Sequence, residues 1–181
     1  NTFSVVVAAN VPTGVYECRA HGLYGTSNPR AFVIGSLPEI QEADASNTRE
    51  GALEVKLNSV VNGKTGGAAD VDYYKFAAKK GQRVLIECTA LRIDSKFQGD
   101  ISVFTSAGKR LARSVARLRR FDPMLDVTVP ADGDYLIRAT DFVYAGSNDY
   151  IYRLKIHTGP HIDFVSPAMG VAGTTSKYTI Y

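Results

Sequence analysis

The spacing of apolar and polar residues predicts short strands separated by tight turns along most of this chain. Residues 70–84 (DVDYYKFAAKKGQRV) place a polar turn between two apolar-aromatic segments, and residues 129–141 (VPADGDYLIRATD) place an Asp-Gly turn before another. Gly and Asp adopt the backbone angles of turns, whereas Tyr, Phe, Val and Ile cover a half-buried pleated face. Alternation puts Tyr74 and Phe76 on one face of the first strand and Tyr73 on the other. Neither segment contains residues typical of a catalytic site.

The same pattern recurs in other parts of the chain. Gly, Asn, Asp or Pro bounds each candidate strand, at the spacing expected of an antiparallel sandwich. A parallel sheet needs crossover helices, and residues 111–120, the only candidate for one, lack an apolar face at helical spacing. The sequence therefore predicts an all-β fold. The candidate strands are residues 3–8, 14–20 and 30–34, followed by LEVKL, DYYKFAA, QRVLIECTAL, ISVFTS, KRLARS, MLDVTV, DYLIRATD and DYIYRLKI.

Changes in composition divide the chain into four parts. A polar, acidic stretch is typical of a linker. The part before it contains strands that would complete a β module but lacks the strands that would begin one. The last part has two strands, too few to bury a core. The chain begins with Asn rather than Met, so we expect it to be a piece of a longer protein whose ends are slices of a repeating array. The predicted parts are residues 1–36, the linker 37–50, the sandwich 51–158, and residues 159–181.

Composition and charge narrow the classes of function. The net charge of +3 is small and no apolar run reaches eighteen residues, so the sequence favours neither nucleic-acid binding nor a membrane span. None of His21, His157 and His161 neighbours a Ser-Gly elbow or a His-Glu metal motif, and no phosphate-binding glycine loop is present. The sequence therefore predicts that this chain is not an enzyme. We expect Cys18 and Cys88 to be small buried thiols, with a disulfide between them as the alternative.

The central segments resemble a known family, the bacterial pre-peptidase C-terminal (PPC) domain, in their order and spacing. The resemblance implies a jelly-roll-like β-sandwich. The flanks are similar to immunoglobulin-like IPT/TIG domains, residues 11–34 to the closing half of one and residues 160–181 to the opening half of another. The segments that match the PPC domain are EADASNT (42–48), DVDYYKF (70–76), KKGQRV (79–84), DPMLDVTVPADGDYLIRATD (122–141) and DYIYRLKI (149–156).

The resemblance, rather than the composition, carries the functional expectation. Such domains occur in large exported and cell-surface bacterial proteins, which implies a secreted or cell-surface location. It implies a non-catalytic structural or adhesion module whose partners are a protein or polysaccharide at the cell surface, or copies of itself. Two alternatives stay open. One is an accessory domain of a secreted peptidase that binds carbohydrate or fibrous protein, and the other is a subunit of a surface layer or extracellular fibre.

Calcium is the one cofactor that the resemblance implies. Calcium-binding relatives carry an acidic linker motif, E-x-E-x-N-D, which pairs with acids just before the strand equivalent to DVDYYKF. Here Ser46 and Asn47 replace the Asn and Asp of the motif, and Ala69 stands where binders have an acid. Calcium takes about six to eight oxygen ligands, and the alternative is that these side chains only close turns. The candidate calcium ligands are Glu42, Asp44, Ser46, Asn47, Asp70 and Asp72.

Two further features suggest a surface for a partner. Residues 109–120 contain six cations and no acid, which suits an anionic partner such as an acidic polysaccharide, a lipid headgroup or an acidic subunit. The alternative is a solvated loop whose charges keep a sheet edge soluble. Exposed tyrosines form a second candidate contact face. The candidate partner surface comprises Tyr73, Tyr144, Arg110, Arg113, Arg117, Arg119 and Arg120.

Overall fold

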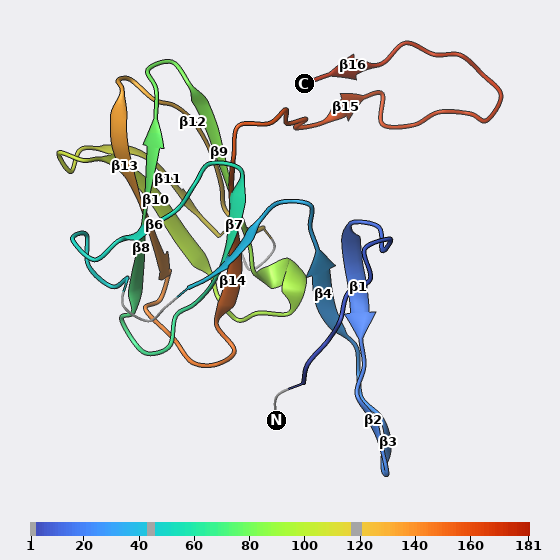
Figure 1. Cartoon of the computed structure of the whole chain (residues 1–181). Coiled ribbons are helices and arrows are strands. Elements are labelled where there is room, and N and C mark those ends of the chain that lie inside the picture. Colours follow the sequence, from blue (N-terminus) through green and yellow to red (C-terminus); the bar gives the residue numbers. More distant parts are fainter. Residues whose placement is uncertain (1–2, 43–45, 117–120) are drawn as a thin grey trace.

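The computed structural model describes residues 3–42, 46–116 and 121–181, and it confirms an all-β fold (Figure 1). Two five-stranded sheets face each other and enclose the core of a β-sandwich. Sheet I has the order β12 (Met124–Thr128), β9 (Arg83–Thr89), β14 (Ile151–His157), β7 (Ser59–Lys64) and β5 (Glu39–Gln41). Sheet II has the order β11 (Arg110–Val115), β10 (Gly99–Thr105), β13 (Gly133–Asp141), β8 (Val71–Ala78) and β6 (Leu53–Glu54).

Each sheet is antiparallel, as predicted, except for one parallel pair at its edge. β5 pairs with β7 in parallel, and β6 pairs with β8 in parallel. The chain passes from β5 to β6 in the other sheet before it returns to β7, and this crossover lets each pair run in one direction. β5 also lies inside the segment predicted as a linker. β7 was not among the predicted strands, and its Asn62-Gly63 pair is typical of a turn.

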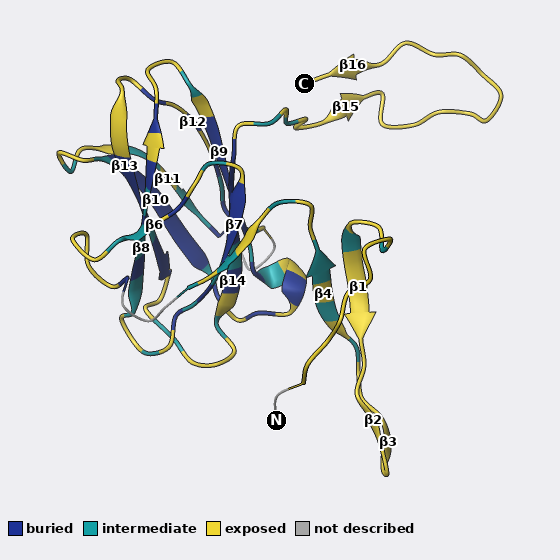
Figure 2. Ribbon diagram, in the orientation of Figure 1, coloured by how far each residue is buried: buried dark blue, intermediate teal, exposed yellow. Residues whose placement is uncertain are grey.

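The buried residues lie along the strands of the two sheets (Figure 2). On β8, Tyr74 and Phe76 are buried, whereas Tyr73 and Lys75 are partly exposed on the outer face, as alternation predicted. Burying an aliphatic or aromatic side chain of this size contributes about 1.5–3 kcal/mol, so the facing sheets stabilise each other. The aliphatic part of the core includes Val61, Val84, Ile86, Ile101, Ile137, Leu154 and Ile156.

The N-terminal part is a small separate ribbon. β1 (Gly14–Cys18) pairs with β4 (Arg30–Ile34), and β2 (His21–Gly22) pairs with β3 (Gly25–Thr26). β4 approaches the sandwich at the short 3-10 helix η1 (Leu91–Ile93), where the Ala31 backbone N–H donates to Asp94 Oδ2 at 3.0 Å. The strand predicted over residues 3–8 is wrong. A strand needs a neighbour for its backbone groups, and no described strand pairs with that segment.

The C-terminal part is equally thin. β15 (Val165–Ser166) pairs with β16 (Thr179–Ile180), and the Phe164 and Tyr181 rings stack with centroids 4.5 Å apart. Most of its apolar side chains stay exposed (Figure 2), which agrees with the expectation that two strands bury no core. The immunoglobulin-like identity of the two ends stays a prediction. Among the described residues, no helix has the length and hydrophobicity to span a bilayer.

The two cysteines lie in opposite environments. Both are free, and Cys88 is buried on β9 as predicted, but Cys18 is exposed, so the prediction for it is wrong. Cys18 shares a face of the β1–β4 ribbon with Tyr16 and Phe32, and this apolar face is only partly covered by described residues.

We expect the native protein to offer one reactive thiol. Cys18 is open to solvent, whereas burial raises the pKa of the Cys88 thiol and shields it from a reagent. Ellman's reagent at pH 8 should therefore modify one thiol per chain quickly and the second only after denaturation. The Cys18→Ser variant should show no fast phase. Two fast thiols in the native protein would contradict this placement of the strands.

Candidate functional site

A cluster of polar side chains occupies one end of the otherwise apolar core. Alternation along β8 turns Asp72 inward together with Tyr74 and Phe76, so its carboxyl lies between the sheets, 2% exposed. Tyr152 of β14 faces it from sheet I and is equally buried. A carboxyl at a core position is rare because desolvation disfavours its charged form. This position therefore needs partners.

Tyr152 donates a hydrogen bond to this carboxyl, and Tyr74 is bonded to Tyr152 in turn. The Tyr152 hydroxyl donates to Asp72 Oδ2 at 2.5 Å, and the Tyr74 and Tyr152 hydroxyls lie 2.5 Å apart. Burial raises the pKa of both phenols, so they stay protonated and act as donors. The Tyr152 ring is held between Phe97, whose ring centroid is 4.7 Å away, and Gly63 on the paired strand β7. Any Cβ on Gly63 would lie 2.4 Å from Tyr152 Cζ.

Glu42 brings the segment after β5 to the same cluster. Its backbone N–H donates to the Asn62 carbonyl at 3.0 Å, and its Oε2 accepts from the Lys64 backbone N–H at 3.0 Å, both on β7. Its Oε1 accepts from the Ser46 hydroxyl at 2.7 Å. The Ser46 carbonyl in turn accepts from the Tyr73 N–H of β8 at 2.8 Å. Glu42 and Ser46 therefore join the predicted linker to both sheets.

The cluster places the buried Asp72 carboxyl beside that of the half-buried Glu42. Burial raises the pKa of Asp72 well above its usual range, the hydrogen bond with the neighbouring Glu42 carboxyl raises it further, and the bond from Tyr152 opposes this. A buried carboxyl next to a second carboxyl does not readily carry a free negative charge, because burial and the neighbouring charge both disfavour ionisation. The two carboxyls must share a proton or hold a cation between their oxygens.

The structure brings together some of the predicted calcium ligands and separates others. Glu42, Ser46 and Asp72 converge, whereas the Asp70 carboxylate turns to the Gly66 backbone N–H at 2.7 Å. Asn47 is exposed and lines a shallow pocket beside Asp70. Asp44 lies outside the described residues. Hard oxygen ligands suit calcium in type, but within the described ranges no three His, Cys, Asp or Glu side chains gather around one point.

Sequence reasoning missed the two tyrosines that complete this cluster. Tyr152 belongs to a strand far from Asp72 along the chain, and only the fold makes them neighbours. One signal was present in the sequence. Asp72 has the same alternation parity as Tyr74 and Phe76, which predicts an acid on the core face of a strand. A buried acid of this kind requires a buried donor or a cation.

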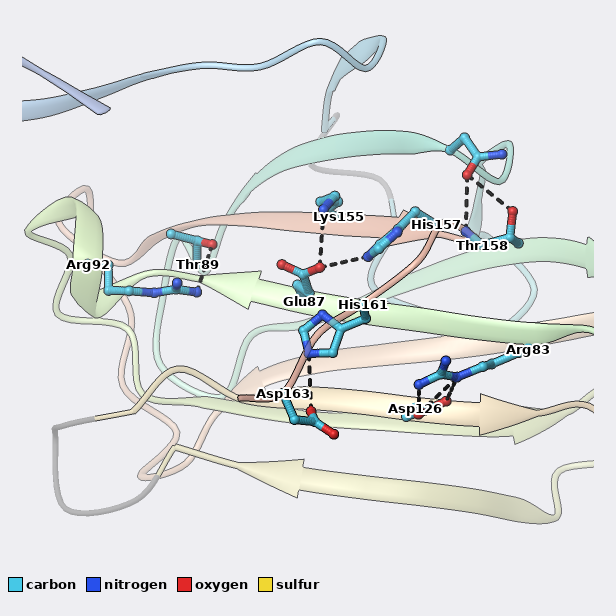
Figure 3. A network of polar contacts seen from close by, with 11 residues as sticks. Arg83, Glu87, Thr89, Arg92, Asp126, Lys155, His157, Thr158, His161 and Asp163 are labelled. Carbon is cyan, nitrogen blue, oxygen red and sulfur yellow. Dashed lines mark hydrogen bonds and ion pairs between the residues drawn. The ribbon is translucent and has the colours of Figure 1, made fainter. Parts of the chain in front are cut away.

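A second polar network lies on the outer face of sheet I (Figure 3). Glu87 Oε1 bonds Lys155 Nζ at 3.1 Å and His157 Nε2 at 2.6 Å. Burial raises the pKa of Glu87, but the hydrogen bonds from Lys155 and His157 outweigh it, and the net pKa is lowered. Arg83 forms a forked pair with Asp126, with its closest contact at 2.6 Å. Each of these carboxylates is matched by cationic or hydrogen-bonding partners, which is typical of a structural face.

The C-terminal segment lies over part of this network. His161 Nε2 is 3.3 Å from Asp163 Oδ1, and Figure 3 shows both side chains close to the Arg83–Asp126 pair. His161 also contributes to the lowered pKa of Asp126, after the larger effect of Arg83. The start of the C-terminal part therefore lies near the charged groups of sheet I. This arrangement contains none of the nucleophile and base pairings of hydrolytic sites among the described side chains.

The structure places the residues of the predicted partner surface in different parts of the molecule. Tyr73 and Arg113 lie on the outer face of sheet II, in one row with Ser102 and Arg138. Arg110 lies on the same face, one pair further along β10 and β11. Tyr144 projects from the turn after β13. Arg117, Arg119 and Arg120 lie outside the described residues.

Comparison with known families assigns the central part of the sandwich to a family. Residues 70–141, from the loop before β8 to the end of β13, match the family model of the bacterial pre-peptidase C-terminal domain. The sandwich contains a PPC domain. This confirms the resemblance on which the fold expectation rested. PPC domains are non-catalytic β-sandwich domains of secreted peptidases, so the assignment supports the prediction that this part of the chain is not catalytic.

Three solved structures are similar to parts of this chain. The PPC domain of a collagenase from Bacillus anthracis matches with a TM-score of 0.47 and 15% identity, over 58% of this chain and 93% of its own. PliG of Aeromonas hydrophila, a periplasmic inhibitor of g-type lysozyme, matches with a TM-score of 0.40 and 18% identity, over 66% and 95%. PliG of Salmonella Typhimurium, also a periplasmic inhibitor of g-type lysozyme, matches with a TM-score of 0.39 and 21% identity, over 59% of this chain and 97% of its own. Comparison with curated proteins finds no match.

Proposed function

We propose that this segment is a non-catalytic structural and adhesion module of an exported bacterial cell-surface protein. In this role the PPC sandwich is a stiff unit, and the segment before it is a fixed joint rather than a free tether. One observation carries the proposal, namely the attachment of Glu42 and Ser46 to β7 and β8 at the same time. A joint bound to both sheets transmits force and orientation to the sandwich.

A cation would strengthen that joint. The Glu42 and Asp72 carboxyls face each other without a neighbouring positive charge among the groups that shift the pKa of Asp72. We propose calcium, held by Glu42 and Asp72 with the Ser46 hydroxyl nearby, because a hard divalent ion takes carboxylate and hydroxyl oxygens. The cation would cancel the repulsion between the two carboxylates. An extracellular location would supply millimolar calcium.

The melting temperature tests this part of the proposal. We expect 5 mM calcium to raise it by several degrees relative to a chelator, because a ligand present at about one hundred times its Kd adds about 2.7 kcal/mol to the native state. Magnesium at the same concentration is the control for ionic strength and valence. An unchanged melting temperature in millimolar calcium would exclude a cation at the joint and leave a shared proton as the explanation.

A second candidate is the accessory role, in which the domain binds a ligand for a peptidase elsewhere in its parent protein. One observation favours it. The turn after β13 exposes three consecutive apolar side chains, Phe142, Val143 and Tyr144. Both roles require a secreted or cell-surface location, and they differ in whether the parent protein carries a peptidase that the domain serves.

A further inference from the structure

The turn after β13 presents its side chains from a rigid backbone. Phe142, Val143 and Tyr144 are 50%, 59% and 57% exposed, although they directly follow a buried strand end. Exposed apolar residues scattered singly need no explanation, but a contiguous group often marks a contact site. Whether this group is a contact site depends on how firmly it is held.

Asp141 holds this turn from the inside. Its buried carboxylate accepts from the backbone N–H groups of Val143 at 3.0 Å, Ala145 at 3.1 Å and Gln98 at 2.8 Å. The Tyr144 N–H donates to the Asp141 carbonyl at 3.0 Å. A flexible tip would not use a buried carboxylate in this way, because such a group is expensive to desolvate. The turn is therefore a fixed platform.

Tyr144 also adopts a strained backbone conformation. Its φ of 57° lies in the left-handed region, which is unfavourable for a bulky residue. The Ala69 N–H donates to its carbonyl at 2.9 Å and keeps it there. Strain of this kind stores about 1–3 kcal/mol and tends to occur at binding sites. Glycine would relieve it, yet the chain has a tyrosine at this position.

Two arginines lie on the adjoining face of sheet II and share one carboxylate. Arg113 takes both oxygens of Asp100 at 2.7 and 2.8 Å, whereas Arg138 Nη2 reaches the same group only at 3.4 Å. Arg138 Nε and the Ser102 hydroxyl, which lie on paired residues, have no hydrogen-bond partner in the described parts of the chain. The local charge is therefore positive, and the Arg138 guanidinium makes fewer hydrogen bonds than it could.

The arginines and the aromatic turn belong to one surface. Asp100, which holds Arg113, pairs with Thr140 of β13, so the turn that begins at Phe142 starts two residues beyond this pair at the same end of sheet II. Arg110 continues the positive charge along the edge strand β11. Projecting aromatic rings beside a line of cations suit a ligand with flat apolar faces and regularly spaced negative charges. An apolar peptide side chain would instead need a pocket to enter.

We propose that this surface, made of Phe142, Tyr144, Arg138 and Arg113, binds an acidic polysaccharide. A sugar ring stacks on the exposed aromatic side chains, and the carboxylate of a uronic acid unit pairs with the two terminal Nη atoms of Arg138, because its Nε is buried. Ser102 and Asp100 form the floor of the surface and orient Arg138. This proposal deepens the adhesion part of the proposed function by naming a ligand class, and it is independent of the cation at Glu42 and Asp72.

Binding of polygalacturonate to the whole chain, measured by calorimetry at 50 mM NaCl, tests the proposal. We expect Tyr144→Gly and Arg138→Gln each to weaken binding about tenfold, the size of one interface hot spot. Both variants should stay folded, because glycine suits the backbone at residue 144 and Asp100 keeps Arg113 as its partner. Arg83→Gln removes an exposed arginine from the outer face of sheet I and is the matched control, with an expected change below about twofold.

The possible outcomes are distinct. Binding of polygalacturonate but not of neutral dextran, lost in the two variants and kept in the control, supports the proposal. No binding, or equal loss in the Arg83→Gln control, overturns it. Equal affinity for poly-glutamate also overturns it, because the surface would then be a general anion site without a role for sugar stacking. A calcium-dependent melting temperature in the same samples shows that the joint is intact whatever the binding result.

Discussion

Replacing Gly63 with alanine should destabilise the sandwich by about 3 kcal/mol, the upper part of the usual range for overpacking a core. The added Cβ would lie 2.4 Å from Tyr152 Cζ and 2.6 Å from its hydroxyl oxygen. The Tyr152 ring cannot move away, because Phe97 stacks on it and its hydroxyl is bound to Asp72 and Tyr74. The substitution must therefore break the polar cluster or separate β7 from β14.

Urea unfolding followed by far-UV circular dichroism measures this loss, since the chain has no tryptophan for fluorescence. Gly67→Ala is the matched control. Gly67 lies in the loop between β7 and β8, and a Cβ there meets nothing within 4 Å, so we expect a change within about 0.5 kcal/mol. Equal stability of the Gly63→Ala and Gly67→Ala proteins would show that Tyr152 does not fill the space above Gly63.

Replacing Asp72 with asparagine should stabilise the protein at pH 8 in the presence of a chelator. Asparagine has the shape of a protonated aspartate, accepts from Tyr152 and donates to Glu42, but it carries no charge. We expect its free energy of unfolding to exceed that of the wild type by about 1–3 kcal/mol, since one unit of pKa shift corresponds to about 1.4 kcal/mol. With calcium present the order should reverse, because asparagine gives up one charged ligand.

The pH dependence follows from the direction of the shift. The pKa of Asp72 is raised in the folded protein to about 8, from an ordinary value of 3.8, mainly by burial. The folded state therefore binds the proton more tightly, and this contribution is fully present below pH 3.8 and lost as the pH rises towards 8. At pH 4 the wild type and Asp72→Asn should be equally stable within about 0.5 kcal/mol. A constant difference between them from pH 4 to 8 would contradict a buried, proton-sharing Asp72.

Local pattern was sufficient to predict much of the sandwich. Alternation around Tyr74 and Phe76 correctly assigned the inner face of β8, and turn residues correctly separated most of the later strands. These features depend on neighbours in sequence, which is why they can be read from it. The family resemblance added the fold, which periodicity alone does not specify.

The errors share a different cause, because each concerns a contact between distant segments. β5 was taken for linker, since its pairing with β7 depends on a crossover through the other sheet. Residues 3–8 look like a strand by composition, but no described strand pairs with them. Cys18 was assigned to a core that the β1–β4 ribbon does not form. Alternation gives the parity of a residue in its strand, but not whether anything covers that face.

The candidate site, too, could be predicted from the sequence only in part. The acids were found from sequence because a family motif includes them, and the structure brings Glu42, Ser46 and Asp72 together. The tyrosine partners and the desolvation of Asp72 arise only from tertiary packing. The sequence only partly indicated the aromatic turn of residues 142–144 that the Asp141 carboxylate holds. Tyr144 was named as a surface residue, but the buried carboxylate that fixes the turn belongs to the fold.

A double-mutant cycle between Glu42 and Asp72 tests most directly whether the segment before the sandwich is locked to it through these carboxyls. The free energy of unfolding is measured for the wild type, Glu42→Gln, Asp72→Asn and the double variant, at pH 8 in chelator. If the two side chains meet in the interior, either substitution relieves the same repulsion. The double variant should then gain little over a single one, with a coupling energy of about 1 kcal/mol or more. Additive effects, within about 0.5 kcal/mol, would show that the two carboxyls do not interact and would contradict the locked joint.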